Sequence, residues 1–343
     1  MDKKSTPEQA LIEQQLELQK KGRFPEKYCQ IALDFLRCYR EALERSGEPF
    51  EPHLSIFRLF FQFIVEQIHS PHLFEPYHRK VRHPFDYYKF GLDFIRPLID
   101  VKHSRVIGEE HLARIEAQIA RGENAIFLAN HQTETDPQAI AILLQENHPK
   151  LAEQLIYVAG ERVVTDPLAM PFSLGCDLLC IYSKRYIDYP PELKAQKQLH
   201  NKNTMELMSR LLAEGGKAIY VAPSGGRDRK TTSGSLAPAP FDPQSIEMFY
   251  LMAKKAKTPT HFYPLALNTY DLLPPPETIQ LELGESRVAK RTPIYISFGP
   301  ECELERYPGH DAPTKEEKRK AKAASVWKTV KTLYDKAQRC GGH

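Results

Sequence analysis

The sequence lacks any apolar run long enough to cross a membrane. A spanning helix needs about 18 to 20 consecutive apolar residues, and the most apolar stretch, residues 54–68, is interrupted by Arg58, Gln62 and Glu66. We therefore expect no integral membrane association. The opening of the chain also lacks the apolar core of a signal peptide and the acid-poor composition of a transit peptide. We expect neither signal in the chain as it is numbered.

The chain also has no excess of charge of either sign and few cysteines. It carries 47 Lys and Arg against 44 Asp and Glu in 343 residues, which gives a formal net charge of +3. That balance excludes a basic nucleic-acid-binding tail, and an apolar content of 41% excludes a disordered chain. Six scattered cysteines make a disulfide framework improbable. Cys176 and Cys180 resemble half of a metal site, but no second pair has ligand spacing, so we predict no metal.

The N-terminal part of the sequence predicts a small helical domain. Apolar residues recur at helical spacing over residues 28–42, and residues 54–68 are apolar nearly all round, which suits a helix that is buried on several sides. We predict a helical bundle over residues 1–75 and an α/β domain over residues 76–343. The alternative is an N-terminal helical extension of a single domain.

After residue 84, short apolar runs alternate with amphipathic helices. This pattern is typical of a mixed, largely parallel sheet that is covered by helices. One helix is expected to end at Gly215 and Gly216, and a last helix to begin near Thr314. Two segments, 184–203 and 223–243, are polar and irregular and follow predicted strands, where ligands of open α/β sheets bind. The predicted strands are residues 125–129, 155–159, 178–182, 218–222 and 262–267, with a sixth candidate over 293–298.

The loop after the strand 125–129 contains a histidine and an aspartate five residues apart, in the sequence NHQTETDP over residues 130–137. A carboxylate that is hydrogen-bonded to an imidazole fixes its tautomer and stabilises the imidazolium ion. His131 and Asp136 are therefore candidates for a general base and its orienting partner. Such a spacing arises easily by chance. The alternative is that Asp136 caps the helix that begins at Pro137 and that His131 is a loop residue.

Two further strand ends carry basic loops. Residues 223–230 read PSGGRDRK, in which glycines let the backbone approach a ligand, while Arg227 and Arg229 present fork-shaped donors suited to phosphate. The GxxxxGK[ST] pattern of a nucleotide P-loop is absent. Residues 183–186 read SKRY. The three strand ends together suit the activation of a hydroxyl on a small phosphorylated substrate. The alternative is that the arginines are solvated loop charges paired with Asp228.

These blocks resemble, in sequence, order and spacing, the soluble, stromal-type glycerol-3-phosphate acyltransferases of plastids and chlamydia-like bacteria. The third block is YPLAL over residues 263–267. The resemblance extends from about residue 80 to residue 300, and the helical N-terminal part is similar in kind to that family's small four-helix domain. The His-x4-Asp block marks the wider acyltransferase superfamily, whereas the string SGGRDR over residues 224–229 is much more specific.

The resemblance implies that His131 is the base, that Asp136 orients it, and that arginines of the second loop bind phosphate. Where the family has a Lys-His pair in the phosphate pocket, this chain has Arg185 and Tyr186, and Tyr186 is a neutral donor. Lys184 is expected to contribute to phosphate binding together with Arg185 and Tyr186. The predicted substrate-binding residues are Arg227, Arg229, Arg185, Lys184, Tyr186, Ser224 and Gly225.

We therefore predict transfer of a fatty acyl group from a thioester of acyl carrier protein, or of coenzyme A, to the sn-1 hydroxyl of glycerol 3-phosphate. No cofactor is expected, because a thiolate leaves readily and no covalent acyl-enzyme is needed. The alternatives are a lysophosphatidate acyltransferase, which would share the His-x4-Asp chemistry, and an inert module that binds a carrier protein or phosphate. The expected location is the bacterial cytoplasm, or the plastid stroma if a transit peptide was removed.

Basic residues near the predicted site suggest how an acidic carrier protein would be attracted. They fall in or beside polar loops, so they predict a positive patch at the mouth of the site. The alternative is that they are scattered, solvated and paired with acidic neighbours. The residues are Arg185, Lys194, Lys197, Lys202, Lys230, Arg287, Lys290 and Arg291.

Overall fold

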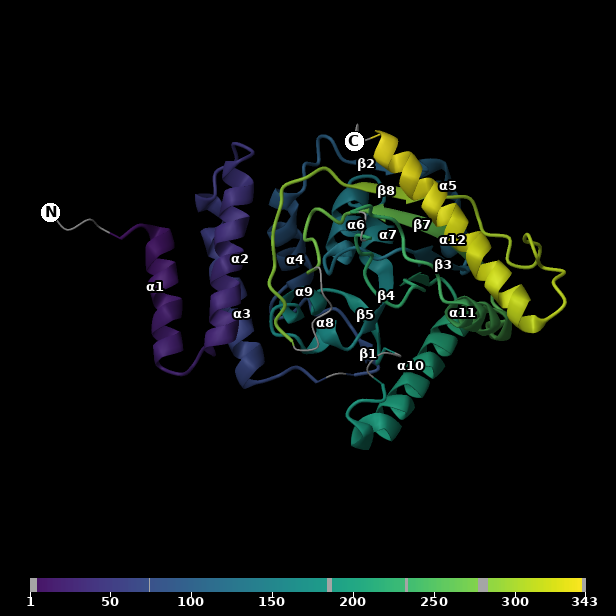
Figure 1. Cartoon of the computed structure of the whole chain (residues 1–343), viewed down its shortest axis with the longest axis horizontal. Coiled ribbons are helices and arrows are strands. Elements are labelled where there is room, and N and C mark those ends of the chain that lie inside the picture. Colours follow the sequence, from purple (N-terminus) through teal and green to yellow (C-terminus); the bar gives the residue numbers. More distant parts are fainter. Residues whose placement is uncertain (1–4, 74, 184–186, 232–233, 277–282, 341–343) are drawn as a thin grey trace.

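The computed structural model describes residues 5–73, 75–183, 187–231, 234–276 and 283–340. The chain begins with three helices, α1 (Pro7–Lys20), α2 (Glu26–Glu44) and α3 (Leu54–His69), which lie together on one side of the sheet-containing part (Figure 1). A short 3-10 helix, η1 (Glu51–His53), precedes α3. The predicted helical character of residues 1–75 is confirmed in the described part of that range.

The N-terminal helices share a hydrophobic core with the rest of the chain. Helix α3 buries aromatic side chains on several sides, as its apolar sequence predicts. The ring of Phe60 lies 5.1 Å from that of Phe94, and the ring of Phe35 in α2 stacks on Phe94 at 6.0 Å. Phe94 belongs to α4 (Tyr87–Ile95). The domain boundary near residue 75 stays a prediction.

The described residues form one mixed sheet of eight strands in the order β1-β5-β4-β6-β3-β7-β8-β2. The pairs β1/β5 and β7/β8 are antiparallel and the other neighbours are parallel. The predicted mixed, largely parallel sheet is therefore confirmed. The strands are β1 (Tyr77–His78), β2 (Arg105–Ile107), β3 (Asn124–Ala129), β4 (Leu155–Gly160), β5 (Asp177–Ile181), β6 (Ala218–Val221), β7 (Thr260–Asn268) and β8 (Tyr295–Phe298).

Helices cover both faces of this sheet (Figure 1). Alternate side chains of β3 enter two different clusters, because successive residues of a strand point to opposite faces. Helices α10 to α12 cover one face, and α4 to α6 cover the other. The remaining elements are η2 (Arg96–Leu98), α5 (Glu109–Ala120), α6 (Asp136–Leu144), α7 (Pro149–Gln154), α8 (Arg162–Thr165), α9 (Met170–Ser173), η3 (Pro191–Leu193), α10 (Lys194–Glu214), α11 (Pro243–Ala256) and α12 (Lys315–Cys340).

Helix α10 corrects one expectation. Residues 184–203 were expected to be irregular, but α10 begins at Lys194. The polarity of its first turns is misleading, because Lys, Gln and Ala are strong helix formers even without an apolar face. The helix ends where predicted, at Gly215, whose φ of 80° is unfavourable for other residues. Among the described residues, no helix combines the length and the apolar character that a membrane crossing requires.

Candidate active site

His131 and Asp136 meet at the carboxyl end of the central strand β3. The Nδ1 atom of His131 lies 2.8 Å from Oδ2 of Asp136. The Asp136 side chain is only 1% exposed, whereas that of His131 is 27% exposed. Because the buried carboxylate engages Nδ1, the partly exposed imidazole has Nε2 left for a substrate proton. The structure thus brings this predicted pair together in the geometry of a base and its orienting partner.

The Asp136 carboxylate is held by several donors and does not act as a helix cap. Its Oδ2 accepts the Gln132 N–H at 2.9 Å, and its Oδ1 accepts the Thr269 hydroxyl at 2.6 Å and the Thr133 N–H at 3.3 Å. Asp136 is the first residue of α6, and Thr135 precedes it as the cap residue. Since the amides bound by Asp136 come before the helix, the helix-cap interpretation is wrong. These bonds fix the carboxylate against the imidazole.

Asp228 joins the second predicted loop to the histidine loop. Its N–H donates to the His131 carbonyl at 2.6 Å. Its carboxylate accepts the side-chain amides of Asn130, at 2.8 Å, and Gln132, at 3.3 Å, and the Ala239 N–H at 2.8 Å. Asp228 is fully buried, and this burial raises the pKa of its carboxyl to about 6. The amide donors counteract only part of the desolvation.

The raised pKa of Asp228 predicts a pH-dependent stability. An aspartate ionises near 3.9 when unfolded, so between about pH 4 and 6 the folded state binds more protons and the free energy of unfolding falls as pH rises. From pH 5 to pH 7 we expect the wild type to lose about 1 kcal/mol relative to Asp228→Asn, which cannot titrate. Urea denaturation of both proteins at the two pH values checks this. Parallel stability curves would contradict it.

Arg227 and Arg229 project from the same loop as Asp228 but have other partners. Nη2 of Arg227 lies 2.6 Å from Glu285 and its Nη1 lies 3.5 Å from Glu134, so the expected alternative pairing with Asp228 is wrong. Nη1 of Arg229 donates to the Pro276 carbonyl. The Arg227 guanidinium therefore contacts the histidine loop through Glu134, whereas Arg229 reaches the segment after β7.

The remaining predicted residues shape the loop or fall outside the description. The Ser224 hydroxyl donates to the Gly226 carbonyl at 3.0 Å. Gly225 has a φ of 70°, which other residues rarely adopt, and a Cβ there would meet no described atom within 4 Å. These two residues therefore form a tight turn with open space in front of it. Lys184, Arg185 and Tyr186 lie outside the residues that the structure describes.

Comparisons with known proteins decide the family. The Acyltransferase family matches residues 103–268. A chloroplastic glycerol-3-phosphate acyltransferase of Cucurbita moschata is 37% identical over 318 residues, which cover 92% of this chain and 71% of the relative. The chloroplastic enzymes of Spinacia oleracea and Pisum sativum are 40% and 42% identical over 82% and 77% of this chain, and over 60% and 58% of their own length. The chain belongs to the glycerol-3-phosphate acyltransferase family.

A solved structure is also similar. The 1-acyl-sn-glycerophosphate acyltransferase of Thermotoga maritima matches with a TM-score of 0.38 and 17% identity, over 72% of this chain and 78% of the other.

Several side-chain contacts around the site of this acyltransferase were not predicted from the sequence. Arg287 pairs with Glu134 at 2.7 Å and lies 3.7 Å from Asp166. Glu134 lies within the sequence block that contains His131 and Asp136, so it could have been predicted as a site residue from its position. Glu285 and Arg287 lie about 150 residues further along the chain, and Thr269 follows β7. Only the fold brings them to the histidine loop, so no local pattern could have predicted these contacts, although Arg287 was predicted as part of a positive patch.

The predicted positive patch of this acyltransferase is corrected in part. Lys197 is buried and Arg287 is only 9% exposed at its side chain, so neither belongs to a surface patch. Arg185 lies outside the described residues. Most of the others have acidic neighbours, which favours the alternative of paired surface charges. The pairs are Lys194 with Asp188, Lys202 with Glu206, Lys290 with Asp271, and Arg291 with Glu48.

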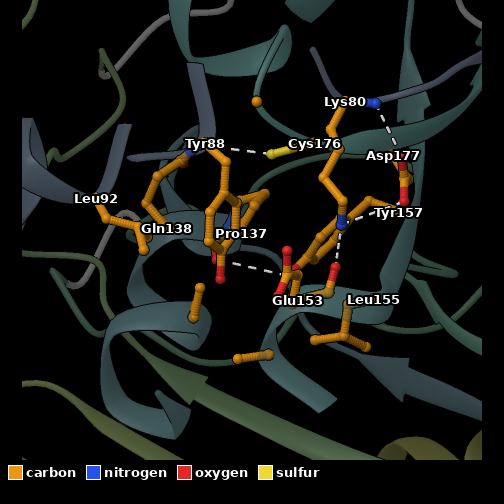
Figure 2. Close-up of a pocket in the computed structure, with 13 residues that line it drawn as sticks. Lys80, Tyr88, Leu92, Pro137, Gln138, Glu153, Leu155, Tyr157, Cys176 and Asp177 are labelled. Atoms are coloured by element: carbon orange, nitrogen blue, oxygen red, sulfur yellow. Dashed lines mark hydrogen bonds and ion pairs between the residues drawn. The ribbon is translucent and has the colours of Figure 1, made fainter. Parts of the chain in front are cut away.

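A small cavity lies behind the start of α6, on the side of Pro137 and Gln138 (Figure 2). Tyr157 and Cys176 also line it, and the Tyr157 hydroxyl points toward the Pro137 carbonyl at 3.5 Å. Burial raises the pKa of the Cys176 thiol to about 12. A thiol with this pKa is protonated at neutral pH and is a poor nucleophile. Cys176 is therefore unsuited to carry an acyl group, although it lines this cavity together with Pro137.

Proposed function

We propose that this acyltransferase moves a fatty acyl group from a thioester to the sn-1 hydroxyl of glycerol 3-phosphate and so forms 1-acylglycerol 3-phosphate. The observation that carries the proposal is the joining of the two loops. Asp228 fixes the loop of Arg227 and Arg229 directly against the His131 loop. A base and two guanidinium groups in adjacent loops suit an acceptor that carries both a hydroxyl and a phosphate.

His131 acts as the general base in the proposed reaction. Nε2 of His131 accepts the proton of the sn-1 hydroxyl as the hydroxyl oxygen attacks the thioester carbonyl, and a tetrahedral oxyanion forms. The intermediate then collapses, the carbon–sulfur bond breaks, and the imidazolium returns the proton to the leaving thiolate. Asp136 accepts the Nδ1–H throughout and stabilises the imidazolium. The acyl group passes directly to the acceptor.

The phosphate of the acceptor is proposed to bind Arg227 and Arg229, because guanidinium groups match phosphate oxygens in geometry and charge. Lys184, Arg185 and Tyr186, which follow β5 in the sequence, are proposed as further donors. Ser224 and Gly225 are proposed to set the loop conformation, through the hydroxyl bond and the positive φ of the turn. The amides of such a loop also suit an anionic ligand.

Acyl carrier protein is the proposed thioester donor, with coenzyme A as the second possibility. The relatives are named as chloroplastic enzymes, which supports a proposed location in the plastid stroma. The bacterial cytoplasm is the other proposed location.

Comparing acceptors and donors in parallel tests the function. Purified protein is offered glycerol 3-phosphate and lysophosphatidate separately, each with acyl thioesters of acyl carrier protein and of coenzyme A. We expect product from glycerol 3-phosphate, acylated at the sn-1 position, and a lower kcat/KM with lysophosphatidate. A preference for lysophosphatidate would contradict the proposed acceptor, and no turnover with either would favour an inert binding module.

Replacing Arg229 by alanine is expected to raise the KM for glycerol 3-phosphate by about 10- to 100-fold, because a charge-assisted hydrogen bond contributes roughly 1.5 to 3 kcal/mol. The KM for the acyl donor should change little. Lys230→Ala is the matched control, since Lys230 is the adjacent cation of the same loop and lies over the Tyr270 ring at 5.8 Å. Equal effects on both substrates, or equal effects of the two variants, would indicate a general positive field and no phosphate contact.

A further inference from the structure

The segment Gly284–Arg291, which we call the strap, lies between the site loops and helix α2. On the α2 side, a Cβ at Gly284 would come within 3.1 Å of the Tyr28 ring, and the Ala289 N–H donates to the Cys38 sulfur at 3.1 Å. The strap is therefore in direct contact with the N-terminal helices. Nothing in the proposed chemistry uses it.

On the other side, two charged side chains of the strap reach both loops of the site. Glu285 pairs with Arg227 of the phosphate loop at 2.6 Å. Arg287 pairs with Glu134 of the histidine loop at 2.7 Å. The strap is fastened further to the connection after β4, since the Gly284 N–H donates to Asp166 at 3.0 Å. One short segment thus connects the loop with the base and the loop with the phosphate ligands.

These ion pairs are shielded from solvent. The side chains of Glu285 and Arg287 are 4% and 9% exposed, and those of Arg227 and Glu134 are 15% and 22% exposed. Burial alone raises the pKa of Glu134, but Arg287 and Arg227 outweigh it and hold the pKa below its usual range. Glu134 is therefore ionised at neutral pH. Removing Glu285 or Arg287 leaves this buried group of charges with an excess of one sign, which moves the attached loop or weakens its attachment.

We propose that Glu285 and Arg287 are positioning residues of the acyltransferase site. Glu285 holds the guanidinium of Arg227 in place for the phosphate, and Arg287 holds the His131 loop through Glu134. Helix α2 contacts the strap on the side opposite to the site loops. The N-terminal helices therefore contribute to the geometry of the site. The assignment of Arg227 to phosphate rests on the proposed function.

The kinetic test uses Glu285→Gln, Arg287→Gln and Arg287→Lys in the full chain. Glu285→Gln is expected to raise the KM for glycerol 3-phosphate by about 10-fold with a smaller change in kcat, and Arg287→Gln to lower kcat by about 10-fold. Arg287→Lys keeps the charge and should recover part of kcat. Glu247→Gln is the matched control, because Glu247 pairs with Lys322 at 2.7 Å, with side chains 18% and 7% exposed, on helices remote from the strap.

A second readout does not depend on catalysis. Hydrogen exchange at the amides of Gln132, Thr133 and Asp228 reports how firmly the two loops are held. Glu285→Gln and Arg287→Gln are expected to speed this exchange by about 10-fold relative to Glu247→Gln, and Arg287→Lys by less. If the wild type does not acylate glycerol 3-phosphate, the proposed function fails and the exchange data alone decide the role of the strap. Exchange rates equal to those of Glu247→Gln would overturn the proposal, whatever the kinetics.

The support from α2 is tested at Gly284. Its φ is 81°, and an added Cβ would meet Tyr28, so Gly284→Ala should displace the strap, raise the KM for glycerol 3-phosphate and speed exchange in the same loops. Gly309→Ala is the matched control, since Gly309 has a φ of 88° and its Cβ would lie 2.8 Å from Ala321, away from the site. If the two glycine variants behave alike, the role of α2 is contradicted.

Discussion

Replacing His131 by alanine is expected to lower kcat by about 10²- to 10⁴-fold, because the attacking hydroxyl loses its general base. The fold should persist, since the His131 side chain is 27% exposed. Turnover with glycerol 3-phosphate and an acyl thioester is measured together with circular dichroism and the melting temperature. The KM values should change much less than kcat.

The matched control for this variant is His261→Ala. His261 also contacts carboxylates, with Glu301 at 2.6 Å and Glu123 at 2.9 Å, and its side chain is 20% exposed, but it stands at the opposite end of β7 from the site. We expect His261→Ala to affect stability and to leave kcat nearly unchanged. A folded His131→Ala variant with wild-type turnover would disprove the assignment of the base.

The second large effect is expected for Asp136→Asn. An amide can donate to Nδ1 and favour the wrong imidazole tautomer, and the imidazolium loses its counter-charge, so kcat should fall by about 10²- to 10⁴-fold. The KM for glycerol 3-phosphate should change little, because Asp136 is 1% exposed and, among the described residues, its carboxylate hydrogen-bonds to its own loop and to Thr269. Steady-state kinetics and thermal unfolding are measured on the same preparations.

Thr269→Val separates the two roles of this carboxylate. It removes the hydroxyl donor at 2.6 Å but leaves the charge and the contact with His131. We expect Thr269→Val to lower kcat much less than Asp136→Asn, while both variants lose stability by about 1 to 3 kcal/mol. If Asp136→Asn keeps its turnover and only loses stability, the carboxylate serves the structure alone.

The main strands could be predicted because each is buried on both faces. Runs such as 125–129 and 218–222 are continuously apolar, which is the pattern that helices on both sides of a sheet impose. Strands β1 and β2 have two and three residues, too few for any periodicity to show. The sheet order was not predictable either, because the strand that neighbours β3 follows from packing and not from local pattern.

In the site, too, local contacts could be predicted from the sequence and long-range contacts could not. His131 and Asp136 stand in one continuous block, so their contact is a local property that spacing could suggest. The tether from Asp228 to Asn130 joins residues 98 positions apart, and the pair of Glu285 with Arg227 joins residues 58 apart. Such contacts depend on the parallel pairing of β3 with β6 and on the return of the chain after β7. The candidate reactive groups could be predicted from the sequence, whereas the residues that fix their positions are known only from the fold.

Direct acyl transfer with His131 as base is tested most directly by measuring thiol release with and without the acceptor. Wild-type protein at a concentration comparable to that of the acyl thioester is mixed first without and then with glycerol 3-phosphate, and thiol and 1-acylglycerol 3-phosphate are quantified together. We expect no burst of thiol before the acceptor is added, followed by thiol and product in equal amounts. A burst that matches the enzyme concentration before acceptor is present would show a covalent acyl-enzyme and contradict direct transfer.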